Sequence, residues 1–180
     1  NSGLSTIYVD TDPHPEFGWT VGSTINIDGK SGIEVQFKPI PPFTSTDYVN
    51  AGSPAVFTIP SSFTTIGVSA FENATTLTSI TIPNTITSIG NYAFKQTTNL
   101  DTVIFEANSI LATIGAASFQ NLTKLTSITI PNSVTSIEDY AFDNTQSLVS
   151  VTFEPGSSLL TIGKKAFRYL IDLPSITIPK

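Results

Sequence analysis

Apolar and polar residues alternate in short runs along most of this chain, and several of the runs end at a proline. A clear example is Ser79-Ile80-Thr81-Ile82, in which two isoleucines are separated by a threonine. Successive side chains of a strand point to opposite faces, so this spacing predicts a short strand with one buried face. Pro83 has no N–H to donate to a ladder, so we expect the strand to end there.

The run recurs at a fixed period. Successive copies alternate between 23 and 25 residues, which gives a two-coil period of 48 residues, and each copy is marked by a leucine: Leu77, Leu100, Leu125, Leu148 and Leu173. The longer copies carry Phe105-Glu106 and Phe153-Glu154 where the shorter ones carry Ile-Pro, and they hold two extra residues before the next Ile-Gly. This self-similarity predicts a solenoid in which each copy is one coil that buries its apolar side against its neighbours.

Further apolar columns follow within each coil. The last is a phenylalanine after a small residue, and we expect it to face the core: Phe71, Phe94, Phe119, Phe142 and Phe167. The Ile-Gly pairs, as at Gly90, predict a second turn. The polar residues after each phenylalanine predict one helical or 3₁₀ turn that returns to the next leucine.

The repeated pattern L-x-x-I-x-I-P-x-x-V-x-x-I-G-x-x-A-F resembles the BspA-like leucine-rich repeat, a class found on surface proteins of bacteria and some parasitic protists. The resemblance covers roughly residues 54–180. It implies a leucine-rich-repeat solenoid of about five coils plus a final strand, with short parallel strands and turn or 3₁₀ returns. Members of the class often have a cysteine three residues after the phenylalanine, where this chain has Thr97 and Thr145, for example.

Residues 1–53 do not follow the repeat. Strands are predicted at residues 7–9 and 19–21, and a hairpin joins residues 23–27 to 33–37 around an Asp-Gly turn. We interpret this segment as a β-rich cap that covers the first coil, because the end coils of an array are apolar. A small independent domain is the alternative.

Composition narrows the function. The chain has 180 residues, a net charge of −6, 12% charged residues and no cysteine, and about a quarter of it is Ser and Thr. The sequence has no basic patch of the kind that predicts nucleic-acid binding. No apolar run approaches the ~20 residues that span a membrane, so we expect no spanning segment. The absence of cysteine excludes disulfides and thiol chemistry.

The last strand signal lies at the C-terminal end of the sequence, at Ile176, Thr177 and Ile178. An uncovered strand edge invites pairing with another chain. Either the chain is cut from a longer array, or this edge stacks on the N-terminal segment of the next molecule. The second explanation predicts end-to-end filaments.

Candidate catalytic and metal-binding residues are few. His14, the one histidine, lies between prolines in a segment expected to be exposed. The acidic side chains of Asp10, Asp12 and Glu16 could offer oxygen ligands to Ca²⁺, but the EF-hand spacing and glycine are absent. Glu106 and Glu154 lie two coils apart, near 10 Å at strand spacing, which is at or beyond the range of an inverting glycosidase pair. We interpret them as solvated turn carboxylates and predict neither a metal, a cofactor nor a catalytic residue.

Small hydroxyls on the predicted strand face form the candidate recognition surface, because leucine-rich repeats bind partners on this face. The set is Ser79, Thr81, Thr102, Ser127, Thr129, Ser150, Thr152, Ser175 and Thr177. The face lacks the aromatic and arginine anchors of binding hot spots, so a merely solvated sheet face is the alternative. A regular hydroxyl lattice is also compatible with ordering water or ice.

Asn73 and Asn121 begin two N-x-[ST] sequences at equivalent positions two coils apart, which makes them candidate glycosylation sites. The sequence thus predicts a non-enzymatic scaffold, extracellular or at the cell surface, that assembles end to end with copies of itself. The alternative is an adhesion or protein-binding module that uses the hydroxyl face, with other proteins or glycans as partners.

Overall fold

The structure is a computed structural model that describes residues 6–9, 24–27, 30–37 and 40–179. It divides into two compact units, Asn1–Pro41 and Pro42–Lys180. The start of the repeat pattern predicts this division at residue 53. The predicted strand at residues 19–21, His14 and the acidic residues at 10, 12 and 16 lie outside the described residues.

The first unit contains a three-stranded sheet in the order β1-β3-β2. Its strands are β1 (Thr6–Val9), β2 (Thr24–Ile27) and β3 (Lys30–Phe37). β2 pairs with β3 in antiparallel fashion, which confirms the predicted hairpin, and β1 adds to β3 as a parallel strand. The expectation that this unit covers the first coil stays a prediction.

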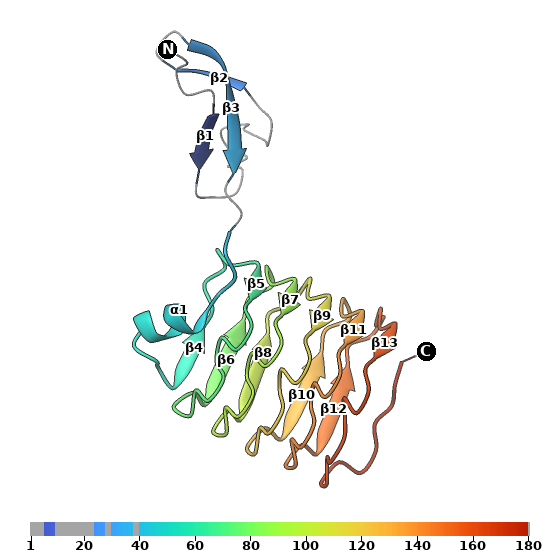
Figure 1. The fold of residues 1–180 in the computed structure, drawn as a ribbon. Coiled ribbons are helices and arrows are strands. Elements are labelled where there is room, and N and C mark those ends of the chain that lie inside the picture. The colour runs from blue at the N-terminus through green and yellow to red at the C-terminus, as the bar shows by residue number, and fades with distance from the viewer. Residues whose placement is uncertain (1–5, 10–23, 28–29, 38–39, 180) are drawn as a thin grey trace. The chain divides into compact units, whose positions relative to one another are not determined.

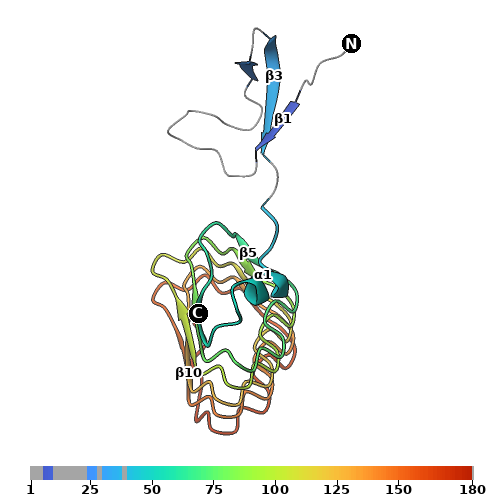
Figure 2. The same ribbon diagram turned by 90° about the vertical axis from the view of Figure 1, so that its left-hand side faces the viewer.

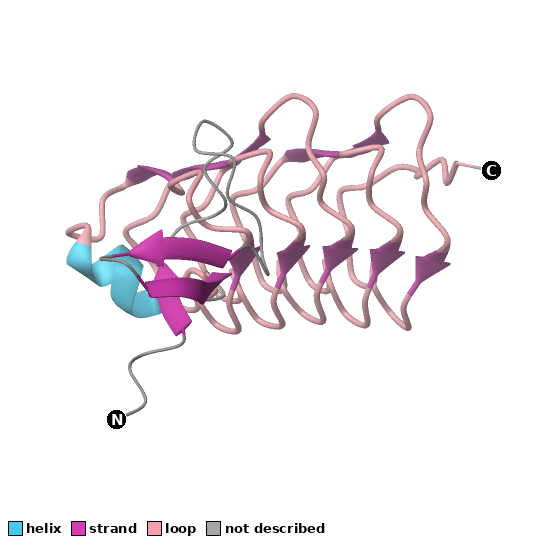
Figure 3. Ribbon diagram, turned by 90° about the horizontal axis from the view of Figure 1, so that it is seen from above, coloured by secondary structure: helices cyan, strands magenta, loops and turns pink. Residues whose placement is uncertain are grey.

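The second unit is the predicted solenoid, and each coil contributes one strand to each of two walls (Figures 1 and 3). The first wall consists of β4 (Val56–Thr58), β6 (Ser79–Ile82), β8 (Thr102–Phe105), β10 (Ser127–Ile130) and β12 (Ser150–Phe153). The second wall consists of β5 (Thr65–Ile66), β7 (Ser88–Ile89), β9 (Thr113–Ile114), β11 (Ser136–Ile137) and β13 (Thr161–Ile162). All ladders in both walls are parallel and match equivalent residues of successive coils.

The second wall was not predicted from the sequence, which indicated only a turn at each Ile-Gly. Gly90 shows why glycine is favoured there: a Cβ atom would lie 2.7 Å from backbone atoms of Gly67 and Val68 in the coil before. At Gly90 the backbone of the coil before therefore lies too close for a side chain, although Glu138 occupies the equivalent position in a later coil. The backbones of successive coils form a five-stranded ladder of two-residue strands.

The return side is a run of turns, and residues 53–179 contain no helical or 3₁₀ segment. The helical or 3₁₀ turn expected after each phenylalanine is therefore wrong. Every second N–H donates to the next coil, as Phe94 N does to Ser118 O at 2.7 Å, and the intervening N–H groups bond within the turn. This alternation requires two left-handed residues per coil, for example Tyr92 at φ 60° and Gln96 at φ 58°. Inter-coil bonding thus replaces the internal bonding of a helix.

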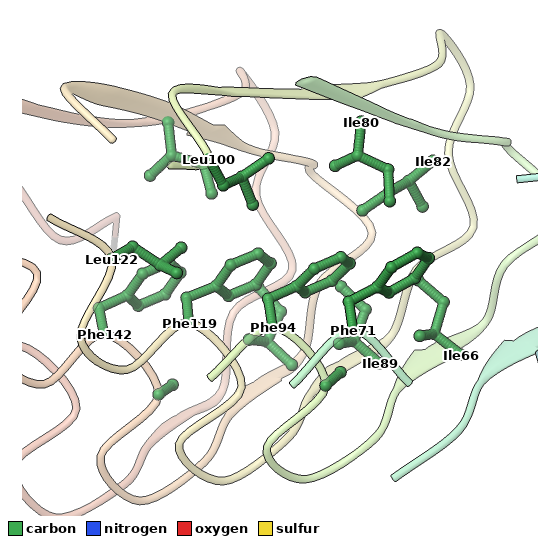
Figure 4. Packing of buried hydrophobic residues seen from close by; sticks show 14 of the residues in the cluster. Ile66, Phe71, Ile80, Ile82, Ile89, Phe94, Leu100, Phe119, Leu122 and Phe142 are labelled. Atoms are coloured by element: carbon green, nitrogen blue, oxygen red, sulfur yellow. The ribbon is translucent and has the colours of Figure 1, made fainter. Parts of the chain in front are cut away.

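The core lies between the two walls, and a stack of phenylalanine rings runs through its centre (Figure 4). Neighbouring rings of the predicted column, from Phe71 to Phe167, lie 5.0–5.3 Å apart and within 11° of parallel. Phe119 and Ile80 of the first wall are fully buried, and Ile89 of the second wall is only 1% exposed. The inward orientation predicted for this column is confirmed.

Residues 43–53 cover the first coil, which explains why the structural boundary precedes residue 53 (Figure 2). Phe43 stacks on Phe71 at 5.2 Å, which extends the phenylalanine column by one ring, and its backbone bridges to Ile66. The six-residue helix α1 (Ser45–Asn50) buries Tyr48 against Phe71. At its start, the Asp47 carboxylate accepts a hydrogen bond from Thr44 N at 2.7 Å.

The first wall is divided: β4, β6 and β8 form one sheet, and β10 and β12 form another. No ladder joins β8 to β10 among the described residues. The break follows a long coil, whose larger Phe105 takes the place of Ile82 in a short coil. β12 is also in a long coil, and the segment after it, residues 174–179, forms no strand. The expected final strand at Ile176–Ile178 is therefore wrong, because the gap after β12 repeats the gap after β8.

Candidate interaction surface

Seven of the nine expected hydroxyls lie on strands of the first wall, but they do not form one lattice. Ser79 and Thr81 of β6 are half-buried, whereas Ser127 and Thr129 of β10 are exposed. Thr129 and Thr152 share a hydrogen bond of 3.0 Å across the β10–β12 ladder. The remaining expected residues are Thr102 and Thr152, which are exposed, Ser150, which is half-buried, and Ser175 and Thr177, which are exposed but outside any strand.

Two exposed apolar side chains accompany these hydroxyls. Val56 of β4 is 70% exposed and Ile104 of β8 is 48% exposed. Both are on the outward face, because their neighbours Phe57 and Val103 pack against the core. The face is therefore a mixture of hydroxyl and apolar groups, and no lysine or arginine lies on its strands.

Glu106 and Glu154 each connect a long coil to the short coil before it. The Glu106 carboxylate accepts a hydrogen bond from Asn84 N at 3.2 Å, and Glu154 accepts one from Asn132 N at 3.0 Å. The amide side chain of each asparagine donates in turn to the loop, Asn84 to Ala107 O and Asn132 to Pro155 O, both at 3.3 Å. Each long coil is thus tied to the short coil before it.

Two hollows open on the first wall, one at each interruption. The first has a volume of about 240 Å³ and lies between residues 103–105 of β8 and 127–129 of β10. The second has a volume of about 450 Å³ and lies between residues 151–157 and the segment containing Ser175, Thr177 and Pro179. We call these hollows groove 1 and groove 2. They lie one two-coil period apart.

Many other hydroxyls in the chain form hydrogen bonds between coils, which the sequence pattern did not indicate. A threonine or serine of one coil donates to a main-chain carbonyl of the coil before, as Thr87 does to Thr64 O at 3.0 Å and Thr135 does to Ala112 O at 3.1 Å. Buried Thr145, at the position where the related class often has cysteine, donates to Phe119 O at 2.7 Å. Much of the unusual Ser and Thr content therefore serves stacking of the coils.

Polar side chains also form a column on the return side, directly after the phenylalanines. Its members are Glu72, Lys95, Gln120, Asp143 and Arg168. Asp143 is buried, and its carboxylate accepts two hydrogen bonds from Arg168, at 2.8 and 2.9 Å, and one from Gln120 at 2.8 Å. The Arg168 hydrogen bond lowers the pKa of Asp143 below its usual value, against the opposing effect of burial.

The two candidate glycosylation residues lie in left-handed positions of the return turns, Asn73 at φ 59° and Asn121 at φ 62°. Asn73 is exposed and borders a hollow beside α1. Asn121 is half-buried and accepts a hydrogen bond from Asn144 at 2.9 Å. Glycosylation of either residue stays a prediction, with Asn73 the more accessible.

Over the described part of the chain, no three histidine, cysteine, aspartate or glutamate side chains come together as metal ligands would. Nor does any described helix have the length and apolar character needed to cross a membrane.

The repeat pattern, the two-walled solenoid and the phenylalanine stack can be compared with known families. The profile of the BspA type leucine-rich repeat region matches six copies over residues 48–173. This chain belongs to that family. The resemblance inferred from the sequence is therefore confirmed, and with it the leucine-rich-repeat fold. A search of curated proteins finds no match.

Several solved structures are similar to this BspA-type chain. The pneumococcal vaccine antigen PcpA is 25% identical with a TM-score of 0.58, over 83% of this chain and 42% of that one. A leucine-rich repeat protein from Bacteroides ovatus is 27% identical with a TM-score of 0.52, over 66% and 35%. One from Bacteroides capillosus is 29% identical with a TM-score of 0.50, over 56% and 77%. The chain spans less than half the length of the first two proteins.

Proposed function

We propose that this chain is a non-enzymatic protein-interaction module, extracellular or at the cell surface, whose partner binds the outward face of the first wall. The observation that carries the proposal is the make-up of this face, where hydroxyls lie beside the exposed apolar side chains of Val56 and Ile104. Family membership supports it, because stacked repeats present extended surfaces that are used for binding. The placement at the cell surface also rests on the family.

The test is selection of a display library of short random peptides on the immobilised chain. Enriched peptides are then bound to a variant that carries both Thr81→Lys and Thr129→Lys. We expect affinity to fall by about tenfold or more, because two long cations cover the face. Unchanged affinity for the double variant, or no enrichment over the bare support, would reject this face as the binding surface.

End-to-end assembly is the second candidate function, and exposed apolar side chains on the last described coil favour it. Leu160 is 82% exposed, Ile171 is 71% exposed and Tyr169 is 61% exposed. Two findings place it second: Ile176–Ile178 forms no strand that could extend the first wall, and α1 with Phe43 covers the first coil. Light scattering across a wide concentration range tests it. Growth that stops in Leu160→Lys supports assembly, whereas a constant monomer mass contradicts it.

A further inference from the structure

We propose that groove 1 binds one extended polypeptide segment, which lies along β8 and β10, and that groove 2 repeats the same site one two-coil period later. The inference rests on the proposed function, since it specifies where on the first wall the partner lies and in which conformation. Binding in the groove differs from binding by the whole hydroxyl face, because equivalent threonines then have different roles. Thr129 borders groove 1, whereas Thr81 does not.

The recurrence of the groove is the first observation. Val103, Ile104 and Phe105 form one side of groove 1, and Val151, Thr152 and Phe153 form the same side of groove 2. The opposite sides correspond in residue type, with Ser127 and Thr129 of β10 in groove 1 and Ser175 and Thr177, which belong to no strand, in groove 2. Since each residue has its equivalent 48 positions later, the grooves are a product of the repeat and not of one irregular loop.

The unpaired strand edges are the second observation. β8 pairs only with β6, and β10 pairs only with β12, so in the described structure the edges that face each other across groove 1 lack ladder partners. Such edges present rows of N–H and C=O groups, which offer hydrogen bonds to an extended polypeptide that lies over the groove. An extended polypeptide matches these rows, and its outward side would lie beside exposed Ile104 and the hydroxyls of Ser127 and Thr129.

The distribution of charge favours a neutral or basic segment. Glu154 borders both grooves, and the exposed carboxylates of Asp101 and Glu106 lie at the two ends of β8. The cations of the last coils, Lys165 and Arg168, lie on the return side and contact the ring of Tyr140 there. A lysine or arginine at the end of the bound segment beside Glu106 and Glu154 would therefore meet carboxylates.

The identical strands β6 and β10 supply a matched pair of variants. Both have the sequence Ser-Ile-Thr-Ile, and Thr81 and Thr129 are equivalent residues. Thr81 lies in a strand that is paired on both sides, whereas Thr129 borders groove 1. The test uses the enriched library peptides on the whole chain, with the single variants Thr81→Lys and Thr129→Lys and with thermal melting to verify folding.

We expect Thr129→Lys to weaken peptide binding by about tenfold, while Thr81→Lys stays within about twofold of the parent chain. Proline at alternate positions of the peptide should abolish binding, because it removes the N–H groups that join the edge. Equal losses in the two variants, or a loss confined to Thr81→Lys, would overturn the groove but leave the proposed function intact. Loss in neither variant rejects both.

A glycan array serves as the second probe. If arrayed glycans bind in a manner sensitive to Thr129→Lys and no peptide does, the polypeptide occupant is wrong. Amide exchange of the peptide complex provides an independent measure. Slower exchange in β10 than in the free chain, with no change in β6, is the expected result, and slowing in β6 alone contradicts it.

Discussion

β6 and β10 have the same four residues but different neighbours. β6 lies between β4 and β8 in a continuous sheet, whereas β10 pairs with β12 alone. Their outward side chains differ accordingly, since Ser79 and Thr81 are half-buried and Ser127 and Thr129 are exposed. Because the strands are identical in sequence, their pairing is determined by the coil that precedes each one.

The second wall shows where the difference arises. Its five strands remain paired through short and long coils alike, so the two extra residues of a long coil do not disturb it. These residues lie in the loop between β8 and β9, which is tied back to Asn84 of the coil before. The loop is thus accommodated on one side only, and the following strand of the first wall, β10, does not pair with the strand before it. The structural unit is a pair of coils.

The largest expected effect on the free energy of unfolding comes from the phenylalanine stack, which lies between the two walls. Phe119→Ala in the middle of the ring stack should cost roughly 3–5 kcal/mol, because a fully buried aromatic side chain leaves a cavity. Denaturant unfolding should then separate into two transitions, one for the coils on each side. A loss below about 1 kcal/mol would contradict the role of this ring in the core.

The return side joins short and long coils without interruption, and the hydrogen-bonded ion pair of Asp143 with Arg168 links two coils there. The pKa of the Asp143 carboxyl is lowered in the folded chain by the Arg168 hydrogen bond. A lowered folded pKa contributes stability above the unfolded value of about 3.9, and this contribution is lost as pH falls through the folded pKa. Urea unfolding from neutral to acidic pH should therefore show a steeper loss in the parent than in Asp143→Asn. Parallel pH curves would contradict this assignment.

Ser118 offers a smaller change within a long coil. Its hydroxyl is buried without a hydrogen-bond partner, whereas the equivalent residues Ala93 and Ala141 have no polar group. Ser118→Ala should therefore stabilise the chain by about 1 kcal/mol. The matched control is Ala93→Ser, which should destabilise it. If both changes shift the melting temperature in the same direction, the hydroxyl of Ser118 is not the cause.

The smallest effect is expected from the loop bonds that define the coil pair. Glu106→Ala removes the acceptor of Asn84 N and should cost below about 1 kcal/mol, since the group is exposed. Glu154→Ala is the equivalent change in the next pair and should have the same effect. Amide exchange at Asn84 and Asn132 measures each bond directly. Unchanged exchange in both variants would mean that other contacts hold the loops.

Sequence patterns predicted two of the features that recur in every coil. Spacing alone located the strands of the first wall and the inward phenylalanine column, because burial repeats at fixed positions. The second wall escaped prediction because two-residue strands are too short for a period-two pattern. Phe43 and α1 were missed because residues 43–53 lie outside the repeat, although Thr44 and Asp47 form a recognisable helix start.

The division of the first wall could not be predicted from strand residues. Ser79–Ile82 and Ser127–Ile130 are identical, so the information lies in the two extra residues and in Phe105 of the coil between them. The same limit produced the error at Ile176–Ile178, where a strand-like sequence follows a long coil and forms no ladder. The hydroxyls of β6, β8, β10 and β12 lie on the outward face as predicted, but their unequal exposure depends on this pairing.

The most direct test of the coil pair is amide hydrogen exchange, measured residue by residue in β6 and β10 of the same molecule. Because the two strands share one sequence, the intrinsic exchange rates of their amides are closely similar. A difference in the measured rates therefore reports a difference in strand pairing. We expect β10 amides that face β8 to exchange about tenfold or more faster than the equivalent β6 amides, which face β4. Equal protection of the two strands would mean that the first wall is continuous, and groove 1 would not exist.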